Sequence, residues 1–189
     1  DTVMVFDELC HGCGGCMIAC PENAIHEELR EIGIVERGKS GSIDFIHGIL
    51  KIGQPMSPPL IKEVRREIPS GLVIIDAPPG TSCPVIASVQ GSDFCLLVTE
   101  PTPFGLNDLK LAVEMVRALG VPFGVAINRA GSGDDETQQY CEDEGIPILA
   151  EIPDDRRVAE LYSRGKVVSR ELPGIVEIFK QLLERIEHP

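Results

Sequence analysis

Four cysteines lie within eleven residues near the start of the chain, and their spacing can hold an iron–sulfur cluster. They are Cys10, Cys13, Cys16 and Cys20, separated by two, two and three residues and followed by Pro21. Such short gaps let thiolates converge on one 4Fe–4S cluster. Gly12, Gly14 and Gly15 lie between these cysteines and permit the backbone to wrap closely. A zinc site and a disulfide pair are the alternatives, but zinc sites usually take two separated cysteine pairs.

The fourth cysteine of this spacing has its own role in proteins with two clusters, where it ligates the other cluster. Cys20 is therefore expected to contribute to a second cluster. The remaining cysteines are poor candidates for its other ligands. Cys95 lies in an apolar run expected in the core, Cys141 lies in a predicted helix, and Cys83 opens another helix. We therefore do not expect this chain alone to hold two complete clusters.

A carboxylate follows a short apolar run in the segment LVIIDAPPGT, residues 72–81. The run Leu72–Ile75 contains no polar residue, which predicts a strand buried on both faces of a parallel sheet. Asp76 then lies at the carboxyl end of that strand, where ligands bind in open α/β sheets. A carboxylate in this place can hold Mg²⁺ beside nucleotide phosphates. The alternative is an ordinary strand that ends in a polar turn.

Apolar runs that alternate with helical patterns predict the frame around these side chains. The expected strands cover residues 3–6, 72–75, 94–98, 123–127 and 146–152. The expected helices lie over residues 60–68, from Thr102 to Gly120, over the acidic stretch 134–144 and over 175–186, with shorter ones after Thr81 and around Val158. Strands that alternate with helices predict an α/β fold with a mostly parallel, doubly wound sheet.

The segment Gly33–Ser40 formally satisfies the phosphate-loop pattern G-x4-G-K-S. That mechanism needs a preceding strand, a flexible loop of backbone donors and a helix that starts at the serine. Here the interior of the loop is Ile-Val-Glu-Arg, and residues 43–52 read as a strand. We therefore expect a β-hairpin with its turn at Gly38–Ser42 rather than a phosphate loop.

Composition limits the class of protein. The 189 residues suffice for one α/β domain and a small appendage, and 43% of them are hydrophobic. A net charge of −13 argues against a nucleic-acid or anionic-membrane surface. No apolar run approaches the roughly 18 residues of a membrane span. Clustered cysteines indicate a metal site in a reducing cytoplasm.

The segment of residues 72–81 resembles the Walker B and switch II region of the MinD/ParA/Mrp class of P-loop ATPases. Residues 1–38 resemble a ferredoxin insert, and residues 96–116 resemble the strand and helix that follow in that class. Together they resemble the subgroup with an inserted ferredoxin-like domain. The resemblance implies a ferredoxin-like module over residues 1–38 and the C-terminal part of a MinD-like nucleotide-binding domain over 39–189. It also implies that the phosphate loop and a second cysteine motif lie upstream of Asp1, so that the chain is a fragment.

The resemblance implies roles for particular residues. Asp76 is the expected catalytic carboxylate, which also associates with Mg²⁺. Asn128 is the expected adenine-binding side chain, because an amide can match the donor and acceptor groups on the edge of adenine. The nucleotide-binding set implied in this way is Asp76, Pro78, Gly80, Asn128, Arg129, Pro153 and Asp154. The implied cofactors are 4Fe–4S clusters and, in the complete protein, ATP with Mg²⁺.

The function implied is an ATP-hydrolysing iron–sulfur protein that couples ATP to cluster redox state or electron transfer. The complete protein is expected to be a cytoplasmic homodimer with a redox partner protein, and this chain alone is expected to be inactive without a phosphate loop. Two alternatives stay open. One is a ferredoxin-type electron carrier on a catalytically silent α/β scaffold. The other is an iron–sulfur assembly scaffold, which is weakened because no Cys-x-x-Cys pair lies near the C-terminus.

Overall fold

The computed structural model describes residues 4, 6, 10 and 13–188 and divides the chain into two compact units. The N-terminal unit comprises Asp1–Pro78 and Cys83–Ser88, and the C-terminal unit comprises Pro79–Ser82 and Val89–Pro189. The predicted strand over residues 3–6 lies partly outside the described residues. The predicted boundary between residues 38 and 39 falls inside a strand of the N-terminal unit and stays a prediction.

A parallel three-stranded sheet forms the centre of the C-terminal unit. Its strands are β3 (Cys95–Thr99), β4 (Phe123–Ala130) and β5 (Ile148–Pro153), in the order β3-β4-β5. Residues 125–127 of β4 are at most 2% exposed, because strands lie on both sides of β4 and helices cover both faces. The three strands predicted for this region are confirmed.

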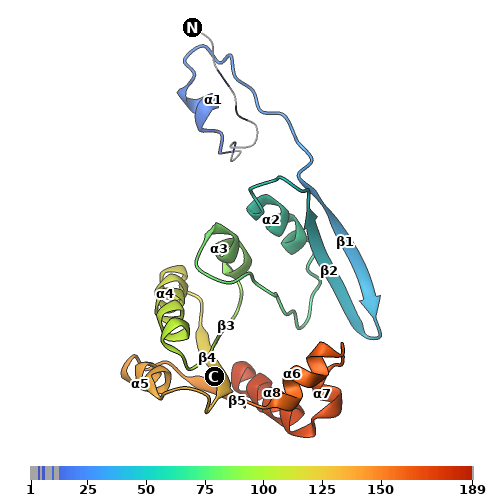
Figure 1. Ribbon diagram of the computed structural model, residues 1–189. Helices are drawn as coiled ribbons and strands as arrows, with labels where there is room; N and C mark the ends of the chain where they lie inside the picture. The colour runs from blue at the N-terminus through green and yellow to red at the C-terminus, as the bar shows by residue number, and fades with distance from the viewer. Residues whose placement is uncertain (1–3, 5, 7–9, 11–12, 189) are drawn as a thin grey trace. The chain divides into compact units, whose positions relative to one another are not determined.

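Helices cover both faces of this sheet (Figure 1). On one face, α4 (Pro103–Leu119) and α5 (Glu136–Asp143) contribute Leu109, Val113 and Cys141 to a core with Val125 and Ile127. On the other face, α8 (Pro173–Glu187) contributes Leu182 to a second cluster with residues of β4 and β5. The short helices α6 (Arg156–Ser163) and α7 (Val168–Glu171) precede α8. The doubly wound α/β fold is therefore confirmed.

Local sequence signals explain the ends of α4. Thr102 is the N-cap, and its hydroxyl accepts a hydrogen bond from the backbone N–H of Gly105 at 3.1 Å. Pro103 occupies the first turn, where its missing N–H costs nothing. Gly120 closes the helix with φ of 67°, a conformation that favours glycine. Both ends agree with the prediction from sequence.

The N-terminal unit contains an antiparallel hairpin of β1 (Gly33–Ser40) and β2 (Ile43–Leu50). Helix α2 (Pro58–Arg66) packs on the hairpin, and a Cβ at Gly48 would lie 2.8 Å from the Leu60 side chain. The unit also holds α1 (Gly15–Ala19) and most of α3 (Cys83–Val89). All of Gly33–Ser40 is strand, so the phosphate-loop pattern there is accidental, as expected.

The predicted buried strand Leu72–Ile75 is wrong for this chain. These residues form no strand, and Leu72 and Ile74 are 71% and 89% exposed. A parallel strand is stable only where neighbouring strands bond its backbone and helices cover its faces. Among the described residues, none supplies a ladder to this run. An apolar run alone therefore does not make a strand, because the strand also needs a partner for its backbone.

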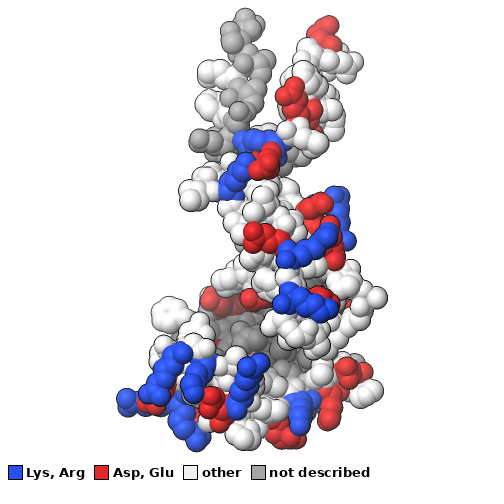
Figure 2. Space-filling model, turned by 90° about the vertical axis from the view of Figure 1, so that its right-hand side faces the viewer, with Lys and Arg blue, Asp and Glu red and all other residues white. Residues whose placement is uncertain are grey.

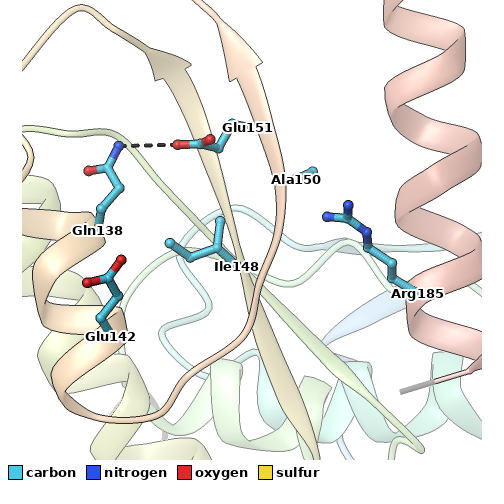
Figure 3. A pocket seen from close by; sticks show the side chains of 6 residues that line it. All are labelled: Gln138, Glu142, Ile148, Ala150, Glu151 and Arg185. Atoms are coloured by element: carbon cyan, nitrogen blue, oxygen red, sulfur yellow. Dashed lines mark hydrogen bonds between the residues drawn. The ribbon is translucent and has the colours of Figure 1, made fainter.

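Among the described strands, β5 lies at an edge of the sheet, and side chains from helices on both faces lie beside it (Figure 3). Gln138 and Glu142 project from α5 on one side, and Arg185 reaches from α8 on the other, around an open cavity of about 290 Å³. The pairing of β4 with β5 shifts register between Val125 and Ala126, and Leu149 is the extra residue of this bulge on β5. Arg185 Nη1 donates to the Leu149 carbonyl at 2.7 Å. This bond satisfies the Leu149 carbonyl at the bulge, where the ladder is irregular. We therefore interpret the polar side chains around the cavity as groups that protect the edge of the sheet from pairing with another strand.

Hydrogen exchange tests the state of residues 72–75. Because these amides lack a ladder, we expect them to exchange at nearly unprotected rates, while the amides of residues 125–127 exchange only on global unfolding. The measurement is peptide-resolved hydrogen–deuterium exchange on this chain. Equal protection of the two segments would show that residues 72–75 are paired in solution.

A second prediction concerns Arg185. Replacement by methionine keeps the aliphatic stem but leaves the Leu149 carbonyl without its charged donor, so we expect unfolding free energy to fall by about 1 kcal/mol. Urea unfolding measures the change. The matched control is Lys180→Met on the same helix, an exposed position where the effect is expected within about 0.5 kcal/mol. Equal stability of the two variants would contradict the bond's importance.

Candidate iron–sulfur and nucleotide sites

The cysteine segment is shaped by α1 and by one left-handed glycine. Gly14 has φ of 71° and precedes α1, Cys16 lies in that helix, and Cys20 ends it. The thiols of Cys10, Cys13 and Cys16 are exposed, whereas Cys20 is partly buried. The segment therefore presents sulfur atoms to solvent on a short, glycine-bounded turn.

The thiol of Cys20 is surrounded by backbone donors. The N–H of Ala24 donates to Cys20 Sγ at 3.4 Å. This bond and a second one from the N–H of Glu22 lower the pKa of the Cys20 thiol. Backbone donors directed at sulfur stabilise the thiolate, which is the form that binds iron.

Within the part of the chain that the structure describes, no group of three His, Cys, Asp or Glu side chains is placed to hold a metal ion. The fit to a cluster therefore rests on the donor set and its spacing.

The carboxyl ends of β3, β4 and β5 form the second candidate site. Glu100 follows β3, Arg129 lies near the end of β4, and Asp154 follows β5. Arg129 Nε donates to Asp154 Oδ1 at 3.2 Å, and Arg129 Nη1 donates to Glu100 Oε2 at 3.4 Å. The two carboxylates raise the pKa of Arg129, with Asp154 the larger cause. One guanidinium thus connects the ends of all three strands.

A bulge lies at this edge. The pairing of β4 with β5 shifts register between Asn128, opposite Ile152, and Ala130, opposite Pro153. Arg129 is the extra residue and has φ of 56°, in the left-handed region. The N–H of Asp154 donates to the Ala130 carbonyl at 3.2 Å and closes the edge. Bulges of this kind redirect side chains and are common beside active sites.

Glycine allows the loop after β4 to pass close to the loop after β3. A Cβ on Gly133 would lie 1.6 Å from the carbonyl oxygen of Pro101, and one on Gly105 would lie 2.3 Å from that of Glu100. Neither position tolerates a larger residue without backbone movement. The two loops are therefore held at the same edge as Asn128.

The structure brings together only some of the residues expected at the nucleotide site. Asn128, Arg129, Pro153 and Asp154 lie at one edge of the C-terminal sheet. Asp76 and Pro78 belong to the N-terminal unit, where both are exposed, and Gly80, with φ of 92°, belongs to the C-terminal unit. Their roles remain proposals.

The sequence prediction placed Glu100 at the end of a strand on this edge but did not include it among the nucleotide-site residues. The available signal was its position directly after an apolar run, the same position that singled out Asp76. Its partner Arg129 lies 29 residues away in sequence, so the ion pair itself leaves no local pattern.

Residues 3–26 match the family of 4Fe–4S binding domains. The fold matches the crystal structure of the cell division ATPase MinD of Pyrococcus furiosus over 69% of this chain and 58% of that one, with a TM-score of 0.56 and 25% sequence identity. The chain has a MinD-like fold and carries a 4Fe–4S binding segment.

Two curated relatives of this MinD-like protein extend the likeness. An uncharacterized protein of Methanocaldococcus jannaschii is 29% identical over 88% of this chain and 58% of its own length. An iron–sulfur cluster carrier protein of Pyrococcus horikoshii is 28% identical over 70% of this chain and 51% of its own length. The chain thus spans little more than half the length of these relatives.

The surface of the MinD-like protein mixes both signs of charge. Ion pairs join Lys51 to Glu31 at 2.7 Å and Lys166 to Glu171 at 3.1 Å, and Figure 2 shows acidic and basic side chains next to one another in both units. Over the described residues, no helix is long and apolar enough to cross a membrane.

Substitution of a cysteine tests the iron–sulfur assignment. In protein made from the complete gene and prepared anaerobically, we expect brown colour near 400 nm with matching iron and sulfide. Cys16→Ser in that protein is expected to lose much of the iron because serine is a poor ligand for the cluster. Cys83→Ser, the control, is expected to keep it. Stoichiometric zinc in a colourless wild-type sample would contradict the assignment.

Proposed function

We propose that this chain forms part of an ATP-hydrolysing iron–sulfur protein of the MinD class, which couples ATP to cluster redox state or to electron transfer. The observation that carries the proposal is the occurrence in one chain of a 4Fe–4S binding segment and a MinD-like sheet with a polar carboxyl edge. A 4Fe–4S cluster supplies one-electron transfer when it is bound. Cys10, Cys13 and Cys16 are the proposed ligands of one cluster, and Cys20 is a proposed ligand of a second cluster.

The sheet edge is the proposed site of the nucleotide base. Asn128 offers an amide that matches adenine, and Pro153 and Asp154 flank it from β5. Asp76 is the proposed partner of Mg²⁺, with Pro78 and Gly80 shaping the loop that follows. The clustered thiols favour a reducing cytoplasm, and the likeness to MinD favours a homodimer of the complete protein.

ATP binding by the isolated chain is expected to be weak. The described residues contain no glycine-rich loop between a strand and a helix, and the one segment with a matching pattern is β1. Without backbone donors for the phosphates, most of the binding energy of ATP is lost. We therefore expect isothermal titration calorimetry of this chain to show no micromolar affinity for ATP.

The test of function uses the product of the complete gene, assayed for ATP hydrolysis with oxidised and reduced clusters. We expect turnover with Mg²⁺ that changes with redox state, and Asp76→Asn is expected to lower it at least about tenfold. Asp108→Asn, an exposed position on α4, is the control. Absence of turnover in every redox state would favour a ferredoxin-type carrier on a silent scaffold.

A second candidate function is cluster delivery, favoured by the similarity to proteins named iron–sulfur cluster carriers. A delivery protein releases its cluster to an acceptor, whereas an electron-transfer protein retains it. Incubation of the reconstituted protein with a metal-free ferredoxin separates the two, because only delivery converts the acceptor to its cluster-bound form.

A further inference from the structure

Arg129 occupies a backbone conformation that its residue type disfavours. Among the described residues, Asn23 and Arg129 are the non-glycine positions with positive φ, at 49° and 56°. Asparagine tolerates the left-handed region because its short side chain can bond the nearby backbone. The hydrogen bonds that the Arg129 carbonyl accepts from the N–H and hydroxyl of Ser132 involve the backbone of residue 129, so they do not require an arginine. Glycine fits this bulge better than arginine does. The local fold therefore gives no reason for an arginine.

Stability gives little reason for an arginine either. The side chains of Arg129, Glu100 and Asp154 are 53%, 43% and 48% exposed. Ion pairs this exposed are screened by water and contribute little to folding. Strained positions persist where the surrounding structure uses them, and they are frequent at ligand sites.

The contacts of Arg129 indicate why an arginine occupies this strained position. Its guanidinium bridges the carboxylates that follow β3 and β5, while its own backbone follows Asn128 directly. Two of its nitrogen atoms donate hydrogen bonds to these carboxylates. Asp154 Oδ2 and Glu100 Oε1 have no partner within the described part of the chain, so each carboxylate keeps one oxygen free to accept a hydrogen bond.

We propose that Arg129 is a positioning residue for base recognition: its bridge to Glu100 and Asp154 fixes the bulge so that Asn128 presents its amide to a 6-amino purine. This inference rests on the proposed function of the same edge. Arg129 acts through its neighbours and does not itself contact the nucleotide. The free carboxylate oxygens add selectivity, because they accept a hydrogen bond from the 6-amino group of adenine and repel the 6-oxygen of guanine.

The test uses this chain, whose C-terminal unit holds all of the residues involved. Adenosine, guanosine and AMP are titrated to millimolar concentration while amide shifts are followed by nuclear magnetic resonance. The variants are Arg129→Gly, which accepts the left-handed φ; Arg129→Lys, which keeps the charge but loses the planar fork; Asp154→Asn; and the double variant Arg129→Gly with Asp154→Asn.

The wild type is expected to prefer adenosine over guanosine. Each single variant at Arg129 or Asp154 is expected to lose at least about fivefold in adenosine affinity. The double variant is expected to lose less than the product of the two single losses, because both changes break the same bridge and only Asp154→Asn also removes an acceptor for the 6-amino group. AMP affinity is expected to fall by the same factor as adenosine affinity. The urea midpoint of Arg129→Gly is expected to equal or exceed that of the wild type. Misfolding would then be excluded as the cause of the lost adenosine affinity.

Three outcomes overturn the inference, and they are distinguishable. Unchanged adenosine affinity in Arg129→Gly would show that the bridge is only a surface ion pair, with the proposed nucleotide function intact. A loss for AMP but not for adenosine would show that Arg129 reads phosphate directly. Failure of the wild type to bind any of the three ligands would overturn the base site itself, and with it the positioning role.

Discussion

The backbone hydrogen bonding of β4 is the constraint on which the described structure depends. A strand buried on both faces must satisfy its N–H and C=O groups through two neighbouring strands, because no water reaches them. β4 meets this condition with β3 and β5, and Val125 and Ile127 are fully buried as a result. The helices α4 and α8 pack on the faces that this pairing creates. Residues 72–75 have the same apolar pattern without the neighbours, and they remain exposed.

The same pairing explains why the candidate nucleotide site lies where it does. Parallel strands end at a common edge, so residues distant in sequence become neighbours there. Glu100, Arg129 and Asp154 follow three different strands and meet through one guanidinium. Neither ion pair is strong enough to organise the fold. The sheet places these groups, and their chemistry then determines which ligand the edge suits.

The iron–sulfur segment is built on a different principle. Its cysteines lie within eleven residues, and their ligand geometry is set by spacing, glycines and the metal rather than by a hydrophobic core. Among the residues that the structure describes, backbone donors such as the N–H of Ala24 support the sulfur of Cys20. This independence from the sheet makes the segment recognisable in sequence and leaves its final geometry to the cluster, since metal binding and folding are coupled.

The sequence by itself determined the features that depend on near neighbours along the chain. These are the thiolate motif, the caps of α4 at Thr102 and Gly120, the strands β3 to β5 and the hairpin in place of a phosphate loop. Asn128 and Asp154 became candidates through the resemblance to the MinD class, which their positions after apolar runs support. Only the tertiary structure decided that residues 72–75 are unpaired, that Leu149 lies at a bulge satisfied by Arg185, and that Arg129 bridges Glu100 and Asp154. The physical reason is that strand partners, bulges and long-range ion pairs depend on which segments meet in space, and the order of residues within one segment does not encode that.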